Sequence, residues 1–206
     1  MRVPAIHSFL INKHIMADNT YTPVSVPKKT DNAGRPKGKA AYLVFFDWDD
    51  VSTYTRDAKG VRVTALAFKA GKKPFAVYQT GSKSNVYDQS EGEDDARGFI
   101  HKVDFEHPGT DIEISEFKEN SINKRLGVIA LNSSGTDAKI AGTPEQPLVM
   151  GSASSQDNNE ADKNTFSLQS NLRGPVLGII AKTLIPETDS ADINTLLGLT
   201  SASVEE

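Results

Sequence analysis

The sequence contains no cysteine among its 206 residues. That absence excludes a disulfide scaffold, a thiolate metal site and a cysteine nucleophile. No apolar run approaches the ~20 residues that a membrane-spanning helix needs, so we expect no membrane insertion. Three glycine-based motifs are also missing, namely the phosphate-binding loop, the dinucleotide-binding fingerprint and the Gly-x-Ser-x-Gly nucleophile elbow. We therefore predict that the protein is not an enzyme and has no cofactor.

The charge of the chain is modest and slightly acidic. It has 23 Lys and Arg residues against 27 Asp and Glu residues, which gives a net charge of −4, and its isoelectric point is near 5.6. This balance argues against a dedicated nucleic-acid-binding protein. Hydrophobic residues make up 37% of the chain and lie in short islands. Because a chain of this length can bury roughly 70% of its unfolded surface, we expect a globular, loop-rich protein with a real core.

The N-terminal 40 residues differ from the rest of the chain. We interpret residues 1–15 as an upstream start or a leader rather than an export signal, with the functional chain beginning near Met16. Residues 17–40 contain three prolines, five basic residues and two acids, a local charge of +3. The prolines and polar residues predict an extended arm without helix or strand. Two interpretations remain open here: a disordered terminus, or an arm that pairs with an acidic surface on a neighbouring subunit.

Most of the remaining chain shows strand patterns. Runs of aromatic and β-branched residues, or clean alternation of apolar and polar residues, predict strands over residues 41–46, 61–68, 74–79, 98–105, 125–131, 164–170 and 175–184, with a short apolar island at 147–150. The segments 81–92 and 151–164 are polar and are predicted to be loops. Six phenylalanines in these strands are candidate core residues: Phe45, Phe46, Phe68, Phe75, Phe99 and Phe105.

One helix is predicted within this β pattern. Thr110 and Asp111 are suitable caps, and Glu113 follows Thr110 at the capping-box spacing. The spacing of Ile114, Phe117 and Ile122 then predicts one apolar helical face that packs on the sheet. The alternative is a strand over 111–115, where isoleucines alternate. A second, short helical turn is predicted at 192–197, and residues 201–206 are predicted to be a frayed tail.

These patterns predict a mainly β (α+β) fold. We expect an antiparallel β-sandwich or barrel with one flanking helix, an extended N-terminal arm and long loops. The predicted organisation is a leader and arm over 1–40, a β-sandwich domain over 41–186 and a C-terminal tail over 187–206.

Acidic clusters are the nearest candidates for a functional site. Carboxylates that could hold Mg²⁺ or Ca²⁺ occur in two segments, Asp47, Asp49 and Asp50 around Trp48, and Asp88, Glu91, Glu93, Asp94 and Asp95. The second segment lacks the ligand spacing of an EF-hand loop, so we interpret both as solvated acidic surface. The four histidines, His7, His14, His101 and His107, form no metal-binding pair at helical spacing. We therefore predict no catalytic, cofactor-binding or metal-binding residue.

A resemblance to a known family concerns the middle and C-terminal segments. The residues that carry it are 99–110, 123–130, 164–170 and 173–175. In the order strand, helix, strand, long loop and two paired strands, residues 97–186 resemble bacteriophage major tail tube proteins. This resemblance implies a β-sandwich with a flanking helix that assembles into stacked hexameric rings. It also implies a lumen lined by a continuous sheet, through which DNA passes. No side chain is diagnostic of that family, so the resemblance implies an architecture and no site residues.

The resemblance predicts a structural virion protein, a tail-tube subunit assembled in the host cytoplasm and located in the virion tail. Its expected partners are further copies of itself in rings and tubes, and other tail proteins. DNA would pass through the lumen without specific binding, because basic lumen contacts would retard phosphates. Alternative interpretations are a phage head decoration or neck protein, a bacterial surface β-sandwich and a small ligand-binding barrel. Obligate assembly distinguishes a tube subunit from a ligand-binding barrel.

Overall fold

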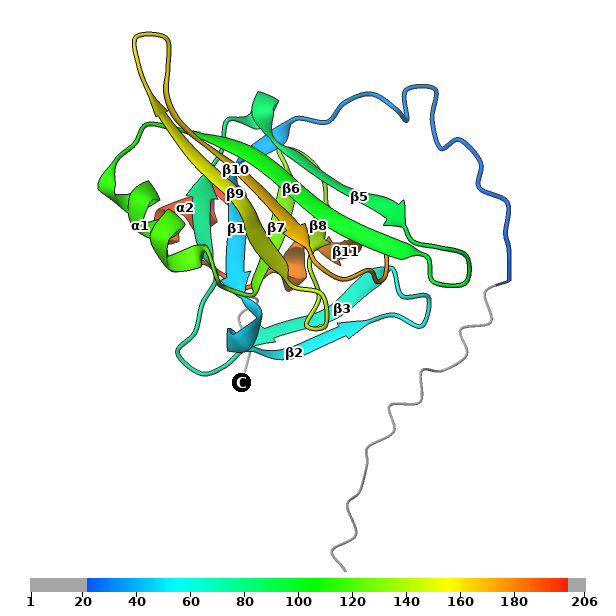
Figure 1. Ribbon diagram of the computed structural model, residues 1–206. Helices are drawn as coiled ribbons and strands as arrows, with labels where there is room; N and C mark the ends of the chain where they lie inside the picture. The colour runs from blue at the N-terminus through cyan, green and yellow to red at the C-terminus, as the bar shows by residue number, and fades with distance from the viewer. Residues whose placement is uncertain (1–21, 200–206) are drawn as a thin grey trace, which may run out of the picture.

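A computed structural model describes residues 22–199, so the predictions for the leader at 1–15 and the tail at 201–206 lie outside the described residues. The protein is mainly β, as predicted (Figure 1). Its strands are β1 (Lys39–Asp47), β2 (Val51–Arg56), β3 (Arg62–Phe68), β4 (Phe75–Tyr78), β5 (Asn85–Glu91), β6 (Gly98–Pro108), β7 (Leu126–Asn132), β8 (Asp137–Ala141), β9 (Leu148–Asp157), β10 (Asp162–Ser170) and β11 (Gly178–Ala181). Its α-helices are α1 (Ile112–Ser121) and α2 (Ala191–Leu197).

Strands β1 and β7 form the centre of the molecule. They pair antiparallel with each other, and side chains on both of their faces are buried. In β1, Leu43 and Phe45 face one hydrophobic core, whereas Val44 and Phe46 face a second one. Because neighbouring side chains of a strand point to opposite faces, a strand between two cores must be apolar at every position. This explains the continuous apolar runs from which both strands were predicted.

Different strands and helices enclose the two cores. The first lies between the central strands and the antiparallel strands β6, β9 and β10, with α1 at one end. The second lies between the central strands and β3, β8 and β11, with α2 beside it. The main path of strands through the sheet is β2-β3-β11-β8-β7-β9-β10-β6-β5, and β1 joins β7 to β4. Among the described strands, every pair is antiparallel except β3 with β11, which run parallel over two residue pairs and depart from the predicted antiparallel arrangement.

The predicted loops at 81–92 and 151–164 are wrong. Residues of the first form β5, which pairs with β6 through seven residue pairs. Residues of the second extend β9 and begin β10, leaving a tight turn between Asp157 and Asp162. The strands β2 and β8 were also not predicted. These segments are rich in polar residues because much of their surface is exposed, so their strand conformation depends on pairing with a neighbour. The predicted strand at 175–184 is shorter, because only Gly178–Ala181 is extended before a 3₁₀ turn.

Helix α1 confirms the helical interpretation over the alternative strand at 111–115. Asp111 is its N-cap and accepts a hydrogen bond from the backbone N–H of Ile114 at 3.2 Å. Phe117 packs against the first core, 5.3 Å from the Phe45 ring centroid. The predicted role of Ile122 is wrong, because this side chain is 50% exposed. The helix ends at Ser121, which is buried where Ile122 was expected to be, and Ile122 follows as the C-cap.

The predicted boundary between the β-domain and a C-terminal tail at 186 is too early. Helix α2 forms where a helical turn was predicted, and it ends at Gly198 in the left-handed conformation, with φ of 59°. Leu197 and Leu199 are buried in the second core. The buried side-chain amide of Asn194 also accepts a hydrogen bond from the backbone N–H of Thr188 at 2.8 Å. The folded domain therefore extends at least to residue 199.

Residues 22–38, called the arm below, form no helix or strand, and nearly all are exposed. Gly38 ties the end of the arm to the body, since its carbonyl oxygen accepts a hydrogen bond from the backbone N–H of Ser133 at 2.9 Å. The chain enters β1 at Lys39, inside the predicted arm. Figure 1 shows the arm, in blue, running away from the body on the side opposite α1.

Candidate functional site: an acidic groove and a polar sheet face

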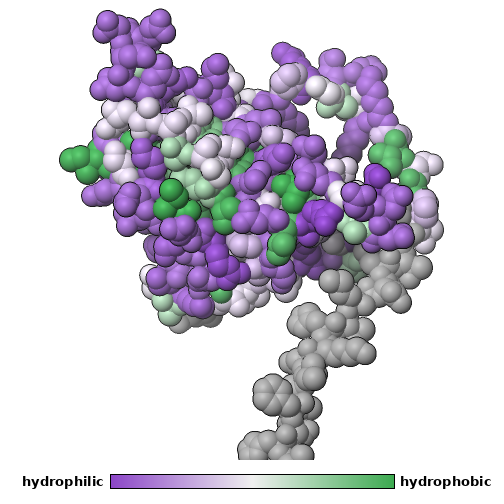
Figure 2. Space-filling view, in the orientation of Figure 1, coloured by the Kyte–Doolittle hydropathy of each residue, from purple (hydrophilic) through white to green (hydrophobic). Residues whose placement is uncertain are grey.

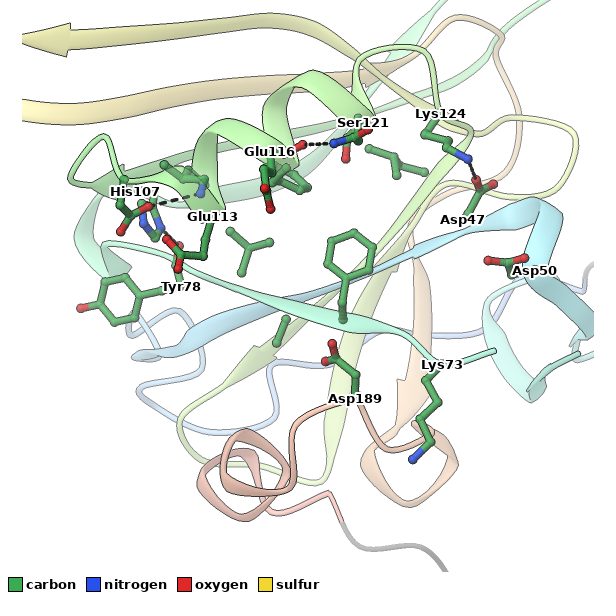
Figure 3. A pocket seen from close by; sticks show the side chains of 18 residues that line it. Asp47, Asp50, Lys73, Tyr78, His107, Glu113, Glu116, Ser121, Lys124 and Asp189 are labelled. Atoms are coloured by element: carbon green, nitrogen blue, oxygen red, sulfur yellow. Dashed lines mark hydrogen bonds and ion pairs between the residues drawn. The ribbon is translucent and has the colours of Figure 1, made fainter. Parts of the chain in front are cut away.

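A groove lies between α1 and β4 and has a volume of about 780 Å³ (Figure 3). Its floor is apolar and is formed by Phe75, Val77, Ile114, Phe117 and Leu126. Its rim is strongly acidic. The rim carboxylates are Asp47, Asp50, Asp111, Glu113, Glu116 and Asp189. Among the described residues that line the groove, Lys73 and Lys124 are the only lysines or arginines, so the net charge of this acidic groove is −4.

Part of this acidity is not neutralised by neighbouring lysines. Asp47 pairs with Lys124 at 3.2 Å, and Asp50 pairs with Lys72 at 3.1 Å. Within residues 22–199, Glu113, Glu116 and Asp189 form no ion pair. Figure 3 shows the two glutamates on the helix side of the groove and Asp189 on the opposite side. The unpaired carboxylates create a negative potential that favours a cationic ligand or segment.

The strand at the groove is an edge strand. Among the described strands, β4 pairs with β1 only, so its second edge faces away from the sheet. The ends of that edge are occupied, because Asp189 N–H donates to the carbonyl of Pro74 at 3.1 Å and His107 Nδ1 lies 3.0 Å from the carbonyl oxygen of Tyr78. Between them, the short edge lies beside the apolar floor. An extended segment is therefore the shape that suits this groove.

A second distinctive surface is the outer face of strands β5, β6, β9 and β10, called the polar sheet face. Along β6, Val103 and Phe105 enter the core, whereas Lys102, Asp104 and Glu106 alternate with them. Hydrogen bonds and ion pairs join the polar side chains across the strands: Lys163 Nζ to Glu106 Oε1 at 3.1 Å, Lys102 Nζ to Glu91 Oε1 at 3.9 Å, and Ser167 Oγ to Asp104 Oδ1 at 2.6 Å. The lysines of this face are thus neutralised by adjacent carboxylates.

His101 is fully buried and has a structural role. Its Nδ1 accepts a hydrogen bond from the backbone N–H of Gly142 at 2.9 Å, so the proton lies on Nε2, which donates to the carbonyl of Pro175 at 2.8 Å. Burial lowers the pKa of His101, although the hydrogen bond to Pro175 opposes that effect. The neutral ring therefore joins β6 to two connecting segments of the chain.

The carboxylates of the two acidic clusters considered as metal sites instead form separate ion pairs, a backbone hydrogen bond and a cap. Asp47 caps a 3₁₀ turn, and Asp49 pairs with Arg125 at 2.7 Å. In the second cluster, Asp88 accepts a hydrogen bond from the backbone N–H of Leu177 at 3.0 Å, and Asp94 pairs with Arg97 at 3.3 Å. Within the described part of the chain, no group of three or more His, Cys, Asp or Glu residues has a geometry suited to a metal ion.

The acidic groove was not predicted from the sequence. Its carboxylates come from three distant segments, near residues 47, 113 and 189, which only the fold brings together. One signal was available in the sequence, namely three closely spaced acids, Asp111 at the N-cap of α1 and Glu113 and Glu116 in its first part. Acids near a helix N-terminus are, however, ordinary partners of the helix dipole, so this signal alone indicates no groove.

Comparisons with known proteins supply no family assignment. No protein-family model matches the chain, and no curated protein or solved structure matches it significantly. In residues 22–199, none of the helices is long and apolar enough to cross a membrane. Function must therefore be inferred from the acidic groove, the polar sheet face and the arm.

Proposed function

We propose that the protein is a structural virion protein, a phage tail-tube subunit that assembles into stacked rings around a DNA conduit. The observation that carries this proposal is that two segments extend from the body and add little to its core. The arm is one, and the distal part of the β9–β10 hairpin is the other. In Figure 2, hydrophilic side chains cover the hairpin tip and most of the arm. Because these segments make few contacts with the core of their own chain, they suit contacts between subunits and between rings.

The polar sheet face supports the same proposal, because it suits the wall of a DNA conduit. A wall with free lysines would hold DNA phosphates by releasing their counterions. On this face, Lys102 and Lys163 are paired with carboxylates instead. Serines and other uncharged polar residues occupy much of the outer surface of β9 and β10. We assign this face to the lumen, with DNA passing over it without specific binding.

Electron microscopy of the purified full-length protein tests the proposal. Negative-stain images should show rings or tubes, and light scattering should give a mass well above the 22.3 kDa of one chain. Rings that stack into tubes also distinguish a tail-tube subunit from a head decoration protein, a neck protein or a bacterial surface β-sandwich. A monomer over a wide range of concentrations would overturn the proposal.

One observation favours a second candidate function, a small ligand-binding domain. The groove volume of about 780 Å³ lies within the range of ~300–1,000 Å³ that small-molecule sites occupy. A ligand-binding domain would remain monomeric, and its ligand would be cationic, given the rim carboxylates. Sedimentation velocity therefore separates the two functions before any ligand is sought.

A further inference from the structure

We propose that the acidic groove of one copy binds the arm of a second copy, with residues 23–29 lying along β4. This inference rests on the proposed function, since it describes a contact between subunits of one assembly. It assigns a specific occupant to the groove and a specific receptor to the arm.

Charge complementarity is the first argument. The groove has six carboxylates and two lysines, a net charge of −4. The predicted arm, residues 17–40, has five basic residues and two acids, a net charge of +3. In the described part of the arm, Lys28 forms an exposed ion pair with Asp31 at 3.7 Å, whereas Lys29 forms none. Complementary potentials of this kind accelerate association and fix its register.

The shape of the arm is the second argument. Val24 and Val26 are 68% and 89% exposed, and they are separated by one residue between Pro23 and Pro27. In an extended segment, side chains two residues apart point to the same side, and the flanking prolines favour an extended backbone. Both valines would then face the apolar groove floor, while Lys28 and Lys29 would follow beside the rim carboxylates.

The direction of the arm indicates a second copy rather than the same chain. Both the backbone N–H and the side-chain hydroxyl of Ser133 donate to the carbonyl of Gly38, at 2.9 Å and 3.2 Å. These bonds fix the point at which the arm leaves the body. From there, the arm runs away on the side opposite α1 (Figure 1), the helix that lines the groove. It is thus placed to meet a neighbouring molecule.

Disulfide cross-linking of full-length chains tests the contact directly. Because the chain has no cysteine, single introduced cysteines report one contact each. A chain with Val26→Cys is mixed with a chain carrying Glu113→Cys, which lies in the groove lining on the same face of α1 as Phe117. The matched control carries Glu119→Cys, an exposed glutamate on the opposite face of the same helix. Mild oxidation should give a covalent heterodimer in the first mixture and several-fold less in the control.

Charge reversal provides the second measurement and identifies which chain supplies the arm. One double variant reverses the charge of the arm (Lys28→Glu and Lys29→Glu), and a second reverses that of the groove (Glu113→Lys and Glu116→Lys). Each double variant should weaken association by about tenfold or more, because each exposed pair contributes a fraction of a kcal/mol and becomes repulsive. Mixing the two reversed chains should restore association, since each arm then meets a complementary groove on the other chain. If each arm instead bound the groove of its own chain, mixing would not restore association, and that result would overturn the proposal.

The outcomes separate this inference from the proposed function. Equal cross-linking at Glu113→Cys and Glu119→Cys would overturn the arm–groove contact, even if microscopy showed tubes. A specific heterodimer in a protein that forms neither rings nor tubes would support the contact and overturn the tail-tube function. Cross-linking of the contact pair should also decrease with added salt, because the rim charges are exposed and screened.

Discussion

Replacement of Gly127 by alanine tests the packing of the two central strands. Gly127 in β7 is opposite Phe46 in β1, and the Phe46 ring lies over it. A Cβ atom at position 127 would be 2.8 Å from Cε1 of that ring and closer to two other ring carbons. Phe46 is 1% exposed, and its centroid lies 4.9 Å from that of Trp48 and 5.4 Å from that of Phe68. The ring therefore has no free space into which it could move.

The expected loss follows from these contacts. Alanine would by itself stabilise a strand relative to glycine by about 0.5–1 kcal/mol. Overpacking a filled core costs about 1–3 kcal/mol, and displacement of the Phe46 ring would weaken two aromatic contacts worth about 0.5–1.5 kcal/mol each. Gly127→Ala should therefore lower the free energy of unfolding by about 2–3 kcal/mol.

A double-mutant cycle in urea or guanidinium gives the measurement. In a Phe46→Leu background the six-membered ring is removed, and Gly127→Ala should then cost less than about 1 kcal/mol. The coupling energy between the two positions should be about 2 kcal/mol, within the range for residues in direct contact. If Gly127→Ala costs the same in both backgrounds, the close approach of the ring is not the reason for the glycine.

Phe117→Ala should cost about 3 kcal/mol, because the half-buried ring anchors α1 on the first core, whereas the exposed Glu119→Ala should stay within about 0.5 kcal/mol. Denaturant midpoints decide, and equal losses would show that the ring is no anchor. Burial lowers the pKa of His101 in the folded protein, so the unfolded chain takes up this proton first on acidification. Stability should therefore decrease as the pH falls below about 6.5, by up to about 1.4 kcal/mol per pH unit from this group. His101→Gln should remove that part of the pH dependence, and an unchanged pH profile would contradict the assignment.

The central layer and the helix could be predicted from the sequence because their signals are local. Residues 41–46 and 125–131 are apolar at nearly every position, and only burial on both faces requires that pattern. Asp111 and the spacing of Ile114 and Phe117 indicated the start of α1 and the side it buries. The mainly β fold class followed from the number of such strands and the single long helical pattern.

Only the tertiary structure decided the exposed strands and the groove. Strand β5 and the outer part of β9 have few apolar residues, so their extended conformation comes from hydrogen bonding to β6 and β10 rather than from their own side chains. Ile122 continues the apolar spacing of α1 but is exposed, because the helix ends one residue earlier. The acidic groove joins residues about 140 positions apart, from Asp47 to Asp189. Such a surface has no local pattern, since its charge depends on which distant segments the packed core places side by side.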